Sequence, residues 1–296
     1  MTAWEKQRSR SAGVFLAPAL LLLATFVLWP LIRAVGWSFT NADLLRPDAS
    51  RWTGGLNYSS LLRDPRFERA FANTAMFALI IVPMQTALAF LCALWVNRPE
   101  RAWRWLRVVF FLPVIVSMPV LAVLWTILYQ PMHGGEGGLI NSTLAWVGLP
   151  TRAWLTDPNW ALPALAFMSI WQGLGLQMMV FLAGLQTVSR ELLEAARIDG
   201  ATAWQRTWAV TLPALRNTVI FVVTVTTILA FRLFVQPYLM THGGPQNRTL
   251  SLVQSIYELT FLNQELGRAC AAAVLFLVLV GALTALQRWL AKEERS

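Results

Sequence analysis

Apolar positions dominate six long runs of this 296-residue chain, and shorter polar segments separate the runs. Each run reaches the length of about 20 residues that a helix needs to cross a ~30 Å hydrocarbon core. The pattern therefore predicts six transmembrane helices, which we place at 13–37, 75–96, 107–129, 161–185, 215–240 and 268–290. The expected fold class is all-α, a polytopic membrane protein with a single transmembrane domain over 1–296.

The composition supports lipid as the surrounding medium. Hydrophobic residues make up 56% of the chain and charged residues only 13%, whereas soluble domains carry about 25% charged residues. Cys92 and Cys270 both lie inside apolar runs, so no disulfide framework is expected. The net charge of +9 does not indicate nucleic acid, because most basic residues flank the predicted helices, where orientation in the bilayer already requires them.

The distribution of basic residues predicts the orientation. Six crossings place both termini on one side of the membrane, and Lys and Arg are enriched on the cytoplasmic side. Of the 24 Lys and Arg residues, fourteen fall on the side of the termini: Lys6, Arg8, Arg10, Arg98, Arg101, Arg104, Arg107, Arg190, Arg197, Arg206, Arg216, Arg288, Lys292 and Arg295. Seven fall on the opposite side: Arg46, Arg51, Arg63, Arg66, Arg69, Arg152 and Arg248. We therefore expect both termini in the cytoplasm.

The polar segment 186–213, between the fourth and fifth runs, has a strong helical pattern. Glu191, Glu194 and Arg197 recur every three residues with apolar residues between them, which predicts a short amphipathic helix at 190–198. On periodicity alone this is an ordinary surface helix, in which an i,i+3 pair of Glu194 and Arg197 adds about 0.2–0.5 kcal/mol.

The following residues predict how that helix ends. Gly200 can adopt the left-handed conformation that terminates a helix, with Asp199 beside it in the turn. A second helical run, 201–211, leads to Leu212-Pro213. Proline suits the first turn of a helix, so we expect Pro213 to start the fifth transmembrane helix.

The spacing of Glu194-Ala195-Ala196, then Gly200, then Leu212-Pro213 resembles the signature loop of the membrane subunits of binding-protein-dependent ABC importers. The resemblance to the carbohydrate and glycerol-phosphate permeases extends along nearly the whole chain, and its beginning resembles the maltose-type "F" subunit more than the "G" partner. It rests on Phe15-Leu16-Ala17-Pro18 with Trp29-Pro30, on Asn73-Thr74, Leu112-Pro113 and Gly138-Leu139-Ile140-Asn141, and on Thr241-His242-Gly243-Gly244-Pro245 and Tyr257 with Phe261. Thr207 and Val210 depart from it, because larger apolar residues are common there.

The resemblance implies the type I ABC importer permease fold, with 186–213 as a cytoplasmic coupling loop on which an ATPase docks. The implied coupling residues are Glu191, Glu194, Ala195, Ala196, Asp199 and Gly200. It also implies a complex in the bacterial inner membrane that contains this chain, a second homologous permease, two copies of an ABC ATPase and an extracytoplasmic solute-binding protein. In such a complex ATP and Mg belong to the ATPase, and this chain is a non-catalytic subunit without a cofactor.

Several missing features agree with that reading. The chain has no Gly-x-x-x-x-Gly-Lys phosphate-binding loop, so the energy must come from another chain or from a gradient. A secondary carrier or a channel is the alternative, but carriers usually place carboxylates inside the membrane, and no Asp or Glu lies in the interior of the six runs. His133 and His242 each precede two glycines and are expected to be turn residues and not metal ligands.

Two helix faces are candidates for a solute path. Ser169, Gln172 and Gly173 share a face of the fourth predicted helix, and Thr226, Ala230 and Leu233 share a face of the fifth. The resemblance implies a solute cavity lined from the middle of these two helices, although ordinary packing of small residues explains the faces equally well.

Arg232 is expected to be the one charged residue well inside the fifth helix. A mid-membrane arginine costs about 2.5–3.5 kcal/mol on insertion scales, so it should face a cavity or partner, or extend to the interface. The expected cargo is a disaccharide or oligosaccharide. Glycerol-3-phosphate or a glycerophosphodiester is the alternative that would use Arg232.

Overall fold

The computed structural model describes residues 15–47, 50–98 and 100–293, and these residues are mostly helical. Four helices in the described ranges are long and apolar enough to cross a membrane: Phe15–Trp37, α4 (Pro65–Val96), α8 (Ala161–Leu185) and Leu266–Leu290 within α14 (Leu266–Glu293). Two bent helix pairs raise the number of candidate spans to six. Residues 13 and 14 of the first predicted helix, and the basic residues before it, lie outside the described residues.

One compact unit comprises the described residues of 1–64 and 256–278. It contains the helix Phe15–Trp37, which includes a π-helical turn η1 (Ala24–Leu28) and α2 (Trp29–Trp37), and the short α3 (Leu56–Leu62). Asp64 and Arg268 form an ion pair at 3.1 Å inside this unit, which joins the end of its first segment to the start of α14.

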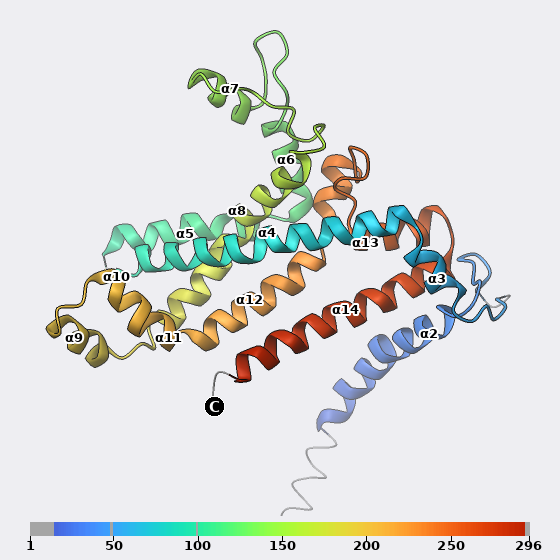
Figure 1. Cartoon of the computed structure of the whole chain (residues 1–296), viewed down its shortest axis with the longest axis horizontal. Helices are drawn as coiled ribbons and strands as arrows, with labels where there is room; N and C mark the ends of the chain where they lie inside the picture. Colours follow the sequence, from blue (N-terminus) through green and yellow to red (C-terminus); the bar gives the residue numbers. More distant parts are fainter. Residues whose placement is uncertain (1–14, 48–49, 99, 294–296) are drawn as a thin grey trace, which may run out of the picture. The chain divides into compact units, whose positions relative to one another are not determined.

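The second compact unit comprises the described residues of 65–255 and 279–296. Within it α4 packs against α8, which crosses it in Figure 1, and also against α12 (Arg216–Phe231). Its apolar core includes Ala89 and Ala93 of α4 and Phe181 of α8, all of them fully buried. The two alanines let the helix backbones approach closely, which is how helices associate where lipid removes the hydrophobic driving force.

α4 begins ten residues before the predicted start at residue 75. Its first residue is Pro65, which suits a first helical turn because that turn leaves its N–H groups unpaired. Further along α4, the Asn73 side-chain amide donates to the carbonyl oxygens of Asn247 (2.6 Å) and Leu250 (2.9 Å). The Thr74 hydroxyl accepts from the Leu252 N–H at 3.0 Å. The family-like Asn73-Thr74 pair thus joins this end of α4 to the loop before α13 (Leu252–Tyr257).

The prediction of one continuous helix over 107–129 is wrong. α5 (Arg101–Ile115) and α6 (Met118–Leu128) are bent by 100° relative to one another. Val116 and the N-cap Ser117 are extended, with ψ angles of 135° and 140°. Pro119, in the first turn of α6, has no N–H to donate to the Ile115 carbonyl, so a continuous α-helix is interrupted there.

The fifth predicted helix, 215–240, is also interrupted at both ends. A helical run over Ala203–Ala214 meets α12 at a bend of 73°. Pro213 lies in that run, in α11 (Leu212–Ala214), and does not start α12, which begins at Arg216. α12 ends at Phe231, and the chain then forms a separate π-helical turn η4 (Pro237–Thr241). By contrast, α8 has the predicted bounds.

Candidate coupling loop and solute cavity

The amphipathic segment forms α9 (Arg190–Ile198), as predicted. Its N-cap is Ser189, whose hydroxyl accepts from the Leu192 N–H at 3.4 Å. No residue of α9 is buried, and the apolar side chain of Ile198 is 86% exposed. Among the described residues no ion pair joins Glu194 to Arg197, so both charges of the predicted pair stay available. The helix therefore presents Leu192, Ile198 and its charged side chains outward, while Leu193 packs against the core.

Gly200 ends α9 in the left-handed conformation, with φ +77°, which confirms the predicted role. Its N–H donates to the Arg197 carbonyl at 3.2 Å, and the Ala201 N–H donates to the Ala196 carbonyl at 3.0 Å. This pair of bonds is the Schellman arrangement, which satisfies carbonyls that a helix end otherwise leaves open. Asp199 is the C-cap beside it.

The next helix, α10 (Ala203–Arg206), is closed at its start by a reciprocal capping box. The Thr202 N–H donates to the Gln205 side-chain oxygen at 2.8 Å, and the Gln205 N–H donates to the Thr202 hydroxyl at 3.3 Å. Local hydrogen bonds thus close both sides of the turn at Gly200, so its geometry does not depend on contacts with the rest of the chain.

The predicted coupling residues lie together on this exposed segment. Glu191, Glu194, Ala195, Asp199 and Gly200 are exposed, and Ala196 is half-buried. Figure 1 shows α9, α10 and α11 gathered at one end of α12. A π-helical turn η3 (Thr207–Thr211) connects α10 to α11. The segment therefore joins α8 on one side to α12 on the other through short connections.

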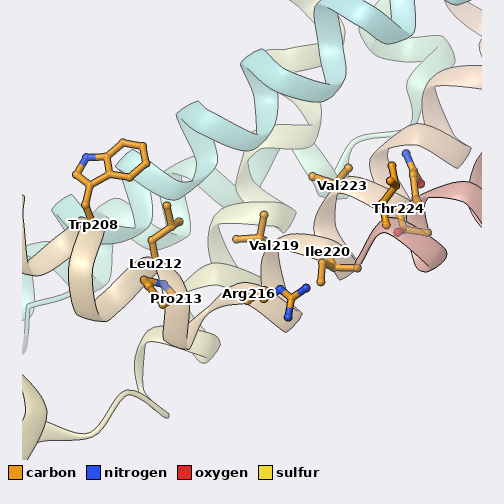
Figure 2. A pocket seen from close by; sticks show the side chains of 10 residues that line it. Trp208, Leu212, Pro213, Arg216, Val219, Ile220, Val223 and Thr224 are labelled. Atoms are coloured by element: carbon orange, nitrogen blue, oxygen red, sulfur yellow. The ribbon is translucent and has the colours of Figure 1, made fainter. Parts of the chain in front are cut away.

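A cavity of about 500 Å³ lies where this segment meets α12. Figure 2 shows Leu212 and Pro213 on one side of the bend, with Arg216 and Val219 directly after it. Gln287 and Leu290 of α14 also line the cavity.

A second cavity, of about 390 Å³, brings together all seven residues of the predicted solute path. They are Ser169, Gln172 and Gly173 of α8, and Thr226, Ala230, Arg232 and Leu233 of α12 and the residues after it. The predicted faces of the two helices therefore do converge on one space.

The polar groups of this cavity fall into two sets. The Ser169 hydroxyl accepts from the Gln236 amide at 3.2 Å, and the Thr226 hydroxyl accepts from the Gln177 amide, so both hydroxyls already join helices. Elsewhere in the described lining, the side chains of Gln85, Gln172 and Arg232 form no hydrogen bond or ion pair. These three are the groups left to meet a bound molecule.

Sequence reasoning missed Gln85 and Gln236, which line the same cavity and are both buried. Gln85 belongs to α4. The periodicity of α8 and α12 gives no information about which residues of α4 line the cavity. A side chain at Gly173 would occupy the space of the Gln85 amide, so this glycine is required by the close approach of Gln85. A glutamine in the long apolar run of α4 was the available signal.

The placement of Arg232 well inside the fifth helix is wrong. Arg232 follows the last residue of α12 as its C-cap, its N–H donates to the Ile228 carbonyl at 3.2 Å, and it is exposed. The chain leaves the helix here, so the arginine is not enclosed by helix packing. It is the one charged residue among those that line the cavity in the described part of the chain.

The sequence matches a family model described as "Binding-protein-dependent transport system inner membrane component" over residues 85–296. A probable ABC transporter permease protein, YurN, of Bacillus subtilis is 35% identical, with 93% of each chain covered. The lactose transport system permease protein LacF of Rhizobium radiobacter is 32% identical, with 95% of this chain and 94% of the relative covered. The sn-glycerol-3-phosphate transport system permease protein UgpA of Agrobacterium fabrum is 30% identical over 93% of this chain and 92% of its own.

A chain of a bacterial ABC transporter involved in the import of alginate has the same fold. The TM-score is 0.83 at 22% identity, with 98% of both chains covered. The match confirms the importer-permease fold expected from the sequence, and the family model covers more than two thirds of the chain, including 186–213, α8 and α12. The chain is thus a multi-pass membrane permease that belongs to the family of inner membrane components of binding-protein-dependent transport systems.

Proposed function

We propose that this chain is the translocation subunit of an ATP-driven importer for a carbohydrate, a disaccharide or an oligosaccharide. The observation that carries the proposal is the connection between the two candidate sites. The exposed helix α9 lies between α8 and α12 in the chain, and α8, α12 and the residues directly after α12 supply most of the cavity lining. A force applied to α9 would therefore act on both walls of the cavity.

In this mechanism an ATPase docks on 190–200, and its closure on ATP tilts α8 and α12 so that access to the cavity alternates between the two sides. Glu191, Glu194, Ala195, Ala196, Asp199 and Gly200 form the docking surface. The partners are two copies of the ATPase, which bind ATP and Mg, a second homologous permease, and an extracytoplasmic solute-binding protein. This chain is not an enzyme, and both of its termini lie in the cytoplasm. In support, a structural relative of this fold was solved in complex with an alginate pentasaccharide-bound periplasmic protein.

The cargo assignment rests on the polar groups of the cavity. Gln85 and Gln172 carry neutral amides, which both donate and accept hydrogen bonds and so suit sugar hydroxyls. Relatives are named for the transport of lactose and of diacetylchitobiose. A neutral sugar would need no compensating charge in the cavity.

An anionic cargo is the second candidate, because of Arg232. No carboxylate is among the described residues that line the cavity, so this guanidinium has no opposite charge there. It can bind a phosphate or carboxylate oxygen in the bidentate geometry that arginine favours. Relatives are named for sn-glycerol-3-phosphate and for sulfoquinovosyl glycerol.

Affinity purification of the tagged chain from its own membranes tests the function class. We expect one ATPase and one second permease to copurify, together with a binding protein when solute is present. A thermal-shift screen of that binding protein against sugars and glycerophosphodiesters then identifies the cargo. Solute transport by the purified single chain in vesicles without ATP would contradict the proposal and favour a secondary carrier or a channel.

A further inference from the structure

Four arginines lie within ten residues where α4 meets α5, Arg98 in the turn and Arg101, Arg104 and Arg107 in the first part of α5, and the structure divides them into two pairs. The Arg107 guanidinium donates to the Val96 carbonyl at 3.1 and 2.7 Å and to the Arg98 carbonyl at 2.7 Å, so it closes the end of α4. The Arg98 guanidinium lies 4.8 Å from the centre of the Trp103 ring. These two arginines hold the turn itself.

The other pair, Arg101 and Arg104, has no hydrogen bond, ion pair or ring contact in the described chain. Together with Trp105 and Val108 these arginines line a cavity of about 330 Å³. The four residues follow the i, i+3, i+4, i+7 spacing of a single helix face. The Trp105 ring is 72% exposed there, although it is a large apolar group. The pocket therefore offers two free cations beside an uncovered indole ring.

An apolar cavity of about 850 Å³ lies further along the same helix. Its walls come from α4, α5, α6 and α8, and every lining side chain is apolar or aromatic, including Val109, Leu112 and Ile115 of α5. Arg104 and Leu112 are eight residues apart, which corresponds to about 12 Å along a helix. The bend between α5 and α6 opens this space, because α6 turns away from the line of α5.

We propose that α5 carries a binding site for an anionic phospholipid. Arg101 and Arg104 hold the phosphate, Trp105 lies at the level of the glycerol backbone, and an acyl chain fills the apolar cavity. Guanidinium groups bind phosphate oxygens in a directional, charge-assisted manner. Indole rings concentrate at the interface of the bilayer, and basic pockets beside membrane-spanning helices bind lipid headgroups.

The combination of the two cavities selects this occupant. An acidic surface of a soluble protein would match Arg101 and Arg104 but would leave the apolar cavity empty. A helix of another membrane subunit would fill the apolar cavity but would not need the arginine pair. A phospholipid with a negative headgroup matches both, and the site does not depend on which solute the protein transports.

Native mass spectrometry of the full-length chain, purified with the subunits that accompany it, tests the site. The probes are phosphatidylglycerol and phosphatidylcholine with identical acyl chains. We expect the wild type to retain phosphatidylglycerol about 10- to 30-fold more than phosphatidylcholine, because two arginines contact the anionic headgroup. The variant Arg101→Gln with Arg104→Gln should retain both lipids equally.

The matched control is Arg46→Gln with Arg63→Gln, which removes the same charge at two exposed arginines and should leave the preference unchanged. Leu112→Trp, which fills part of the apolar cavity, should lower the retention of phosphatidylglycerol with both arginines intact. The proposal is overturned if the double variant keeps the preference, or if millimolar glycerol phosphate displaces the lipid. Loss of copurifying subunits with an unchanged lipid preference would instead assign the arginines to a protein contact.

Discussion

Gly200 provides a graded test of the proposed coupling role, because its backbone conformation disfavours a side chain whereas the space around it would admit one. Its φ of +77° lies in the left-handed region, whereas a Cβ built at this position would meet no atom within 4 Å. A substitution therefore carries a cost in backbone conformation alone. For a residue other than glycine or asparagine that cost is about 1–2 kcal/mol, which lowers the population of the turn about 5- to 30-fold.

The series Gly200→Asn, Gly200→Ala and Gly200→Val separates this cost from side-chain size. Asparagine visits the left-handed region readily, alanine does so less, and valine is the least compatible because it is β-branched. We expect the amount of ATPase that copurifies with each variant to fall in that order, with about a 5- to 30-fold loss for valine. Quantitative immunoblotting of ATPase against tagged chain measures it.

The amount of each variant in the membrane is the internal control. No residue of α9 is buried, so a distorted turn should leave insertion and the helical core intact. If Gly200→Val binds as much ATPase as the wild type and supports the same uptake, the left-handed turn has no role in coupling and the reasoning fails.

Three further substitutions test other parts of the structure. Glu194→Lys reverses an exposed charge of the docking surface and should abolish uptake without reducing the amount of chain in the membrane; undiminished uptake would argue against docking there. Asn73→Ala leaves two backbone carbonyls without their donor and should lower the free energy of unfolding by about 1–3 kcal/mol, measured by thermal unfolding in detergent against the exposed control Ser59→Ala. Gly173→Leu places a side chain in the space of the Gln85 amide and should reduce uptake while ATPase still copurifies; normal uptake would remove the cavity from the solute path.

The presence of the long apolar helices was predictable from the sequence, because the length of an apolar run shows whether a helix can span a bilayer. The bounds of a helix were predictable only where the apolar run and the helix end at the same residue, as at Leu185 of α8. The predicted start of α4 is too late because Arg66, Glu68 and Arg69 are polar. Hydropathy does not distinguish a polar helical turn from a loop. The break at Val116 was hidden because Pro119 lies inside a continuous apolar run.

The two candidate sites differed in how much the sequence could reveal. The turn at Gly200 depends on hydrogen bonds within about five residues, so local spacing was sufficient to predict its conformation. The cavity depends on which helices meet, and the pattern of one helix identifies a face but not its partner. The residues of α8 and α12 were therefore found from periodicity, whereas Gln85 of α4 required the tertiary structure.

The π-helical turn at Thr207–Thr211 makes the direction in which α9 faces tolerant of a change in the length of this segment. A π turn holds one residue more than an α turn, so deletion of one residue here can restore a regular α-helix without unfolding it. Because the π turn absorbs that extra residue within a single turn, the deletion would leave α10 and the turn at Gly200 facing nearly as before, whereas a deletion in a regular α-helical turn would rotate them by about 100°. The segment from Gly200 to α12 can therefore lose one residue at Thr207–Thr211 without turning the proposed docking surface on α9 in a new direction.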